Sequence, residues 1–286
     1  MKENEETRLA RFRRHCYDGT EARAEYLALP GGVNLNVVSF KPVSSSHYPP
    51  VLFIPGLASV IESFAGVISA LTKDFIVYYL ETREKESSRL PGGAAFGVRE
   101  MAGDIAFAAE ALGLKEKNYI IVSYSYSATL SVEMFSTDLK VYPSLMVLVQ
   151  PVTEFRVPWF GIPLAKYLYP LYPVVKPFLK LYFRRSLIDT EKDMEMYNIS
   201  VRSLDSAHPR KMAKTILAMS GYRMGEAAKK INVPVMVIST SQDTFHRHDD
   251  TLKIVSLISR ARHTDLVTNT RSHSGEVCDL VKEYFT

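Results

Sequence analysis

The chain has 286 residues, of which 47% are hydrophobic and 23% are charged, and its formal net charge is +4. This length is enough for one large or two small α/β domains with a core of several layers. The charge is too small and too dispersed to indicate a nucleic-acid-binding protein. The two cysteines, Cys16 and Cys278, lie far apart and predict neither a disulfide scaffold nor a metal site.

The beginning of the chain and its hydropathy indicate a cytoplasmic protein. Residues 1–14 are charged and lack the apolar core of a signal peptide. No apolar run approaches the roughly 18 residues that a membrane-spanning helix needs. With so few cysteines, a reducing compartment is the simplest assumption, and we therefore expect a cytoplasmic location.

The first half of the chain predicts a hairpin followed by alternating strands and helices. Two β-type runs, 22–29 and 34–41, flank a turn at Pro30-Gly31-Gly32. Short apolar runs, typical of strands buried on both faces, and runs with helical spacing then alternate along the chain. The predicted strands are 51–54, 75–80, 119–122 and 145–149, and the predicted helices are 60–72 and 98–112.

The second half predicts the end of the same sheet and an insertion. We expect strands at 233–239 and 264–268 and a helix at 275–284. The alternation favours an α/β fold with a mostly parallel sheet and helices on both faces. Residues 152–230 are rich in proline and aromatic residues and show no strand pattern. We expect them to form a helical cap inserted between the two parts of the core, residues 1–151 and 231–286.

The segment from Ile121 to Ala128 joins a predicted buried strand to a predicted helix and carries a candidate nucleophile, Ser125. In a Gly-x-Ser-x-Gly elbow the serine lies on a tight strand-to-helix turn, with small residues two positions before and after it. Here these positions hold Ser123 and Ser127, which are small but carry a Cβ atom. A serine-rich turn that caps the following helix is the alternative interpretation.

A serine nucleophile needs a base and a partner that orients the base. Asp243 follows the strand predicted at 233–239, and His273 lies between the last strand and the last helix. Both positions belong to the carboxyl edge of a parallel sheet, where active sites gather. We therefore expect Ser125, Asp243 and His273 to form the catalytic group, with Glu154 as a less favoured alternative for the acid.

At this point the chain resembles the α/β-hydrolase superfamily, in particular its capped, esterase- or lipase-like serine hydrolases. The resemblance rests on residues 51–57, 119–135, 233–243 and 265–276. It implies an oxyanion hole made by the backbone amides of Leu57 and Tyr126. The sequence departs from the family at Pro55, where a histidine is usual, and at the two serines that replace the elbow glycines. Related epoxide hydrolases and dehalogenases are disfavoured, because they place an aspartate where Ser125 stands.

A second polar cluster lies just after Asp243, in His246-Arg247-His248-Asp249-Asp250. Such a cluster can bind a metal ion, but an arginine separates the two histidines and no further ligands are evident. We therefore expect no metal site and no cofactor.

The sequence thus predicts a serine hydrolase that cleaves a carboxylic ester or thioester through an acyl-enzyme. The apolar segment 160–183 indicates an apolar acyl group. Its basic and aromatic character is also compatible with contact to a membrane surface, although its prolines interrupt the helical period. Two alternatives remain open: a non-catalytic protein of this fold that binds a small ligand or a partner, and a C–C bond hydrolase or lyase with the same triad.

Overall fold

The computed structural model describes residues 5–114, 118–138, 141–243 and 246–286. Eight strands form one sheet in the order β1-β2-β4-β3-β5-β6-β7-β8. The pairings β1–β2 and β2–β4 are antiparallel, and every pairing from β4 to β8 is parallel. The sheet confirms the predicted fold class. The strands are β1 Glu21–Leu29, β2 Val33–Lys41, β3 Val51–Ile54, β4 Val77–Leu80, β5 Ile120–Tyr124, β6 Leu145–Val149, β7 Val235–Ser239 and β8 Ala261–Asp265.

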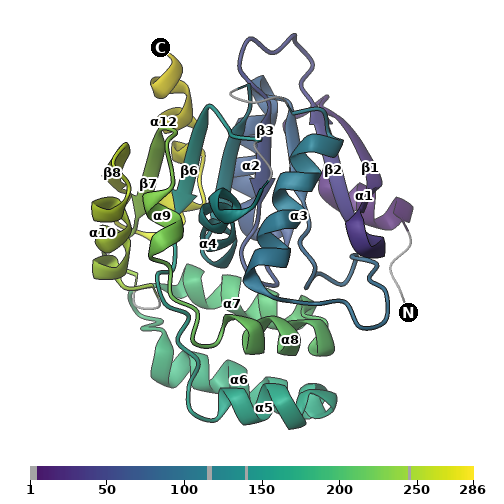
Figure 1. Cartoon of the computed structure of the whole chain (residues 1–286), viewed down its shortest axis with the longest axis vertical. Helices are drawn as coiled ribbons and strands as arrows, with labels where there is room; N and C mark the ends of the chain where they lie inside the picture. Colours follow the sequence, from purple (N-terminus) through teal and green to yellow (C-terminus); the bar gives the residue numbers. More distant parts are fainter. Residues whose placement is uncertain (1–4, 115–117, 139–140, 244–245) are drawn as a thin grey trace.

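Helices cover both faces of the sheet, and each face has its own apolar core (Figure 1). One core packs α1, α2 and α12 against the sheet, and the other packs α3, α4, α9 and α10 against the opposite face. The central strands β3, β5, β6 and β7 are buried along their whole length, as their uninterrupted apolar runs require. These helices are α1 Glu5–Arg13, α2 Ala65–Asp74, α3 Val98–Ala111, α4 Tyr126–Glu133, α9 Glu226–Lys229, α10 His248–Leu257 and α12 Glu276–Phe285.

The last strand differs from its prediction. We expected residues 264–268, whereas β8 runs from Ala261 to Asp265. This strand forms the edge of the sheet, and its middle residues are exposed polar side chains. It therefore lacks the apolar run on which the prediction relied. The helix α10, which precedes it, was not anticipated either.

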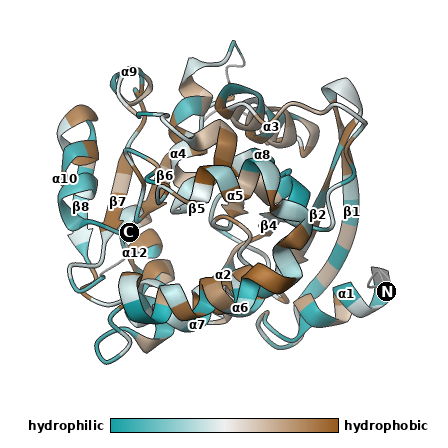
Figure 2. Ribbon diagram, turned by 90° about the horizontal axis from the view of Figure 1, so that it is seen from below, coloured by the Kyte–Doolittle hydropathy of each residue, from teal (hydrophilic) through white to brown (hydrophobic). Residues whose placement is uncertain are grey.

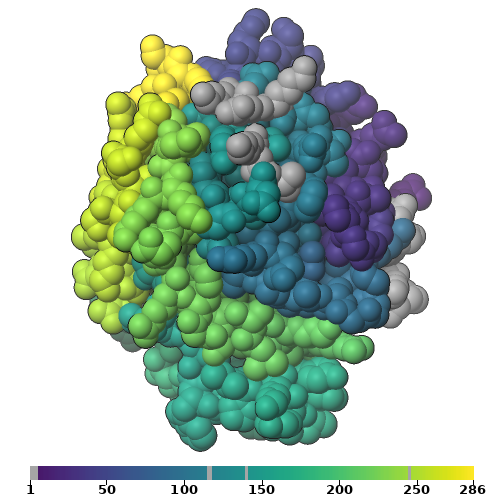
Figure 3. All heavy atoms as spheres, in the orientation of Figure 1, coloured from purple at the N-terminus to yellow at the C-terminus, as the bar shows by residue number. Residues whose placement is uncertain are grey.

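Residues 152–230, which we expect to form the insertion, contain helices and no strand. They form the lower end of the molecule in Figures 1 and 3. The helices α7 and α8 lie next to the sheet, and α5 and α6 form an outer layer beneath them (Figure 1). No helix in the described part of the chain is both long and apolar enough to cross a bilayer. The outer and inner helices are α5 Gly161–Tyr167, α6 Tyr172–Tyr182, α7 Met194–Ser206 and α8 Pro209–Met219.

Candidate active site

Ser125 lies on a tight turn between the buried strand β5 and the helix α4. Its backbone has φ 50° and ψ −118°, a conformation that costs a non-glycine residue about 1–3 kcal/mol. The Ser125 amide donates a hydrogen bond to the Val149 carbonyl at 2.8 Å, which fixes the turn against β6. This is the geometry of the predicted elbow, and it argues against a simple capping role, because the Ser125 side chain makes no cap hydrogen bond to α4.

The two serines that stand at the elbow's glycine positions are accommodated within the fold. Ser127 Oγ donates to the Pro55 carbonyl at 2.6 Å and so connects the elbow to the loop after β3. Ser123 is fully buried in β5. Gly56, on the loop that Ser127 contacts, approaches the elbow closely, since a Cβ there would lie 3.7 Å from Ser125 Cβ.

The hydrogen-bond partner of Ser125 is His246. Ser125 Oγ lies 2.8 Å from His246 Nε2, and His246 Nδ1 lies 2.7 Å from Asp243 Oδ2. The His246 amide also donates to Asp243 Oδ1 at 3.1 Å. A single loop after β7 therefore supplies both residues. The two hydrogen bonds to Asp243 hold the His246 imidazole against the carboxylate on one side, and its Nε2 contacts the serine on the other.

Asp243 is buried and belongs to a polar network that the sequence did not predict. Gln150, at the end of β6, has its Nε2 2.5 Å from Asp243 Oδ2 and 2.6 Å from Asn269 Oδ1. Asn269 in turn donates to Asp193, which caps the first turn of α7. Gln150 thus orients the acid, and the network joins the acid to the cap. A polar residue that directly follows a buried strand is the sequence signal that could have indicated it.

The structure does not bring His273 to Ser125, and this corrects the predicted base. His273 ends the short helix α11 (Asn269–Ser272), and its Nδ1 lies 3.0 Å from the Asn269 carbonyl. Its ring packs between apolar neighbours, with ring centroids 5.3 Å from Phe64 and 5.1 Å from Tyr124. Aromatic packing and a local backbone contact therefore hold this imidazole, whereas His246, three residues after Asp243, is the histidine in contact with Ser125.

Burial lowers the pKa of His273 to about 4. An exposed histidine has a pKa of about 6.5, so between these values the unfolded chain binds the proton and the folded protein does not. We therefore expect His273 to reduce the free energy of unfolding by up to about 3 kcal/mol as the pH falls from about 6.5 to about 4. The measurement is urea unfolding across this pH range for the native protein and for His273→Phe, which keeps a ring but cannot titrate.

The difference in stability between the two proteins should change across this pH range. The variant His47→Gln is the control, because His47 is exposed, and it should follow the native protein. Parallel stability curves for the native protein and His273→Phe would contradict this, because they would mean that the pKa of His273 is the same in the folded and unfolded states.

The other candidate residues lie elsewhere. Glu154 is partly exposed and forms an ion pair with Arg223 at 3.2 Å, so it does not take part in the Ser125 group. In the polar cluster after Asp243, His246 contacts Ser125, and the His248 ring packs against His263 with centroids 5.7 Å apart. Within the described residues, no group of three or more histidine, cysteine or acidic side chains has the arrangement of a metal site.

The backbone amides of Leu57 and Tyr126, which we expect to form an oxyanion hole, lie on the loop after β3 and at the start of α4. Tyr126 begins α4, and the first amides of a helix have no intrahelical acceptor and carry the positive end of its dipole. The loop that contains Leu57 is held by the buried Lys85, whose Nζ donates to the Gly56 carbonyl at 2.7 Å and to the Ser59 carbonyl at 2.9 Å. This loop is therefore fixed before any substrate binds.

The helix α7 lies along the carboxyl edge of the sheet, next to these residues (Figure 1). Near its end, Ser206 Oγ donates to the Ala58 carbonyl at 2.8 Å, and in its middle Arg202 Nε donates to Ser63 Oγ at 3.1 Å. The apolar segment 160–183, expected to line an acyl pocket, lies on the far side of α7 and α8 (Figure 1). Leu171 and Phe178 are 53% and 68% exposed there.

Comparison with known proteins gives a clear result for the fold and none for the sequence. No family model and no curated protein matches the chain. Among solved structures, an esterase from Exiguobacterium antarcticum superposes with a TM-score of 0.72 at 14% identity, over 92% of this chain and 100% of the esterase. The enol-lactonase from Burkholderia xenovorans LB400 gives 0.70 at 17% identity, over 91% and 98% of the two chains. A bromoperoxidase from Bacillus anthracis gives 0.68 at 14% identity, over 92% and 98%.

The chain has the α/β-hydrolase fold. In this fold the sheet brings the ends of β3, β5, β6 and β7 to one edge, where Leu57, Ser125, Gln150 and Asp243 follow them in that order. The identities are too low to transfer an activity from these structures. The assignment of chemistry therefore depends on the side chains of this chain.

Proposed function

We propose that this protein is a serine hydrolase that cleaves a carboxylic ester or thioester through an acyl-enzyme. The observation that carries the proposal is the continuous contact from Ser125 Oγ through His246 to Asp243, with distances of 2.8 and 2.7 Å. A nucleophile, a base within hydrogen-bond reach and a carboxylate behind the base form the arrangement that activates a serine hydroxyl.

In the proposed reaction, Ser125 Oγ attacks the substrate carbonyl while its proton passes to His246 Nε2. Asp243 stabilises the imidazolium by accepting a hydrogen bond from Nδ1–H. The proton on Nε2 then goes to the leaving alcohol or thiol. A water molecule, deprotonated by the same imidazole, then attacks the acyl carbonyl, and the imidazolium returns this proton to Ser125 Oγ as the bond to the acyl group breaks and the acid leaves. The amides of Leu57 and Tyr126 would donate to the oxyanion, and each such donor is typically worth about 100- to 1,000-fold in rate.

We further propose that residues 152–230 act as the cap of this site through α7, the helix that contacts the Ala58 loop and the Asn269 network. The apolar acyl group expected from segment 160–183 has no support from this placement, because that segment lies outside α7 and α8. The preference for chain length is therefore a property to be measured.

Covalent labelling separates a hydrolase from a non-catalytic binding protein of the same fold. A fluorophosphonate should react with the native protein at Ser125, identified by mass spectrometry of the labelled peptide. A panel of p-nitrophenyl esters of increasing acyl length should then show turnover. Absence of both labelling and turnover over the whole panel would contradict the proposed function.

The acid is tested by Asp243→Asn. An asparagine cannot stabilise the imidazolium and favours the wrong imidazole tautomer, so we expect kcat to fall by about 10⁴-fold. Glu154→Gln is the matched control, because Glu154 pairs with Arg223 away from Ser125, and its kcat should remain close to that of the native protein. If Asp243→Asn leaves kcat unchanged and Glu154→Gln lowers it, the acid is the residue that follows β6.

A further inference from the structure

The outer helix α6 has an unusual orientation, with its charged side facing the protein and its apolar side facing solvent. Lys176 and Lys180 form ion pairs with Asp205 of α7 at 3.0 and 2.7 Å, and Tyr172 Oη donates to the Leu204 carbonyl at 2.6 Å. These three residues recur every four positions and so share one face of the helix. α6 is thus attached to the cap by its polar face.

The opposite face of α6 is an apolar stripe without a partner. It consists of residues that recur at three- and four-residue steps from the turn before α6 to its end: Leu171, Val174, Phe178 and Leu181. Their exposed fractions are 53%, 65%, 68% and 45%. We call this stripe, together with Trp159 at 87% exposure, the outer cap face. Figure 2 looks onto this end of the molecule, with α5 and α6 on the side of the viewer.

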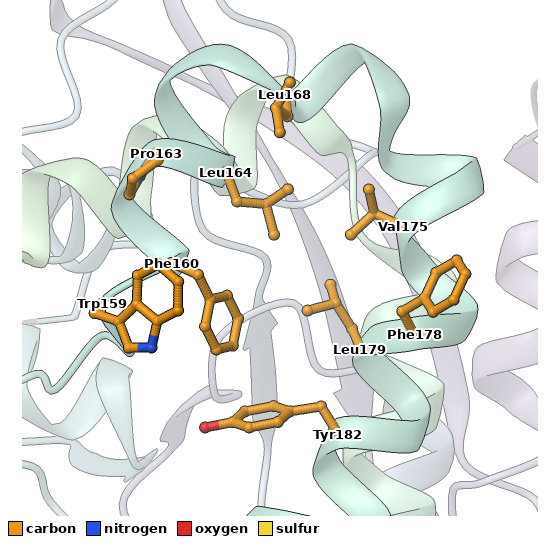
Figure 4. Close-up of a pocket in the computed structure, with 9 residues that line it drawn as sticks. All are labelled: Trp159, Phe160, Pro163, Leu164, Leu168, Val175, Phe178, Leu179 and Tyr182. Carbon is orange, nitrogen blue, oxygen red and sulfur yellow. The ribbon is translucent and has the colours of Figure 1, made fainter.

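A groove continues the outer cap face between α5 and α6 (Figure 4). It has a volume of about 390 Å³ and is lined by apolar side chains from both helices, among them Leu164, Leu168 and Leu179. Trp159 and Phe178 stand at its rim in Figure 4. A soluble monomer rarely exposes an apolar patch of this extent without a binding role.

The segment that carries the outer cap face, residues 155–188, has charged side chains of one sign. Residues 155–188 contain six arginines and lysines and no aspartate or glutamate. Within the described residues, no carboxylate pairs with Lys166, Arg184 or Arg185. Two copies of this face would bring like charges together, which opposes self-association, whereas an anionic surface would neutralise them.

We propose that the outer cap face docks on the surface of an anionic lipid bilayer. The stripe on α6 and Trp159 would enter the interface between headgroups and acyl chains, and the three unpaired cations would contact lipid phosphates. Pro173 and Pro177, which argued against a helical face in the sequence, do not interrupt it, because α6 is continuous from Tyr172 to Tyr182. This inference goes beyond the proposed hydrolysis and does not depend on it.

Trp159 gives a direct measurement, because it is the single tryptophan of the chain and lies in the proposed contact. Vesicles of phosphatidylcholine with about 30% phosphatidylglycerol should shift its emission to shorter wavelength and carry the protein in flotation. Pure phosphatidylcholine vesicles should bind much more weakly, and about 0.5 M salt should reduce binding to the anionic vesicles by screening the cations.

Two sets of variants test the apolar and the charged contributions separately. The double variant Val174→Glu/Phe178→Glu should abolish flotation and the emission shift. The matched control Val43→Glu/Leu252→Glu changes two exposed apolar residues elsewhere and should bind as the native protein does. Replacing Lys166, Arg184 and Arg185 with glutamine should weaken binding roughly 100-fold, since each basic residue near such a surface contributes about a fivefold gain.

Three results would overturn the proposal. The first is an emission spectrum that anionic vesicles leave unchanged. The second is equal loss of binding in the control and in the face variant. The third is concentration-dependent dimerisation in sedimentation velocity that Val174→Glu/Phe178→Glu removes, which would assign the face to a second copy of the chain. None of these measurements uses catalytic activity, so failure here leaves the proposed hydrolysis untouched, and an inactive protein can still bind lipid.

Discussion

Replacing His246 with alanine is expected to lower kcat for a p-nitrophenyl ester by about four to six powers of ten. His246 is the imidazole 2.8 Å from Ser125 Oγ, and among the described residues no other side chain forms a hydrogen bond with this oxygen that could take up its proton. KM should change little, because the side chain acts on the proton transfer rather than on substrate binding. The measurement is steady-state kinetics on protein whose unfolding transition matches that of the native chain.

His273→Phe is the decisive comparison for this prediction. Its ring packs on Phe64 and Tyr124, and phenylalanine preserves that packing while removing the imidazole nitrogens. We expect its kcat to stay within about tenfold of the native value, because its role is structural in this arrangement. If His273→Phe is inactive while His246→Ala retains activity, the loop after β8 supplies the base and the contact at His246 is not catalytic.

Replacing Ser125 with alanine is expected to remove both turnover and fluorophosphonate labelling. The reacting oxygen is lost, and the oxyanion donors alone leave at most a residual rate of about 10³–10⁴ over the uncatalysed reaction. The fold should persist, because alanine has no greater steric conflict with the positive φ of the elbow than serine has. Thermal unfolding of the variant checks this point.

The neighbouring serines provide the controls for Ser125→Ala. Ser123→Ala should remain active, because Ser123 is buried in β5 and contacts no reacting group. Ser127→Ala removes the hydrogen bond to the Pro55 carbonyl and should cause a partial loss of kcat through the oxyanion loop. Full activity in Ser125→Ala would remove this residue from the mechanism and direct attention to the two controls.

The sequence by itself determined most of the sheet and two of the three residues that we propose to react. Runs such as Val51–Ile54 and Leu145–Val149 are too short and too uniformly apolar for anything but strands buried on both faces, and the structure has them at these bounds. Ser125 follows such a strand directly, and Asp243 comes a few residues after another. Because the strands are parallel, their carboxyl ends meet at one edge of the sheet, independently of the conformation of the loops.

Only the tertiary structure decided which histidine approaches Ser125. His246 and His273 both lie near the carboxyl edge, and strand order alone favoured the latter. The outcome depends on the contacts that each imidazole makes in the folded chain. The His273 ring packs against Phe64 and Tyr124, whereas the contact with Asp243 holds the His246 ring beside Ser125.

The sequence likewise did not predict which face of α6 points to solvent. The spacing of apolar residues on α6 indicates an apolar face, but it does not indicate whether that face packs on the protein or on a partner. Here the ion pairs of Lys176 and Lys180 with Asp205, formed between residues more than twenty positions apart, turn that face outward. Contacts of this kind depend on how α6 and α7 pack, and so they exist only in the folded chain.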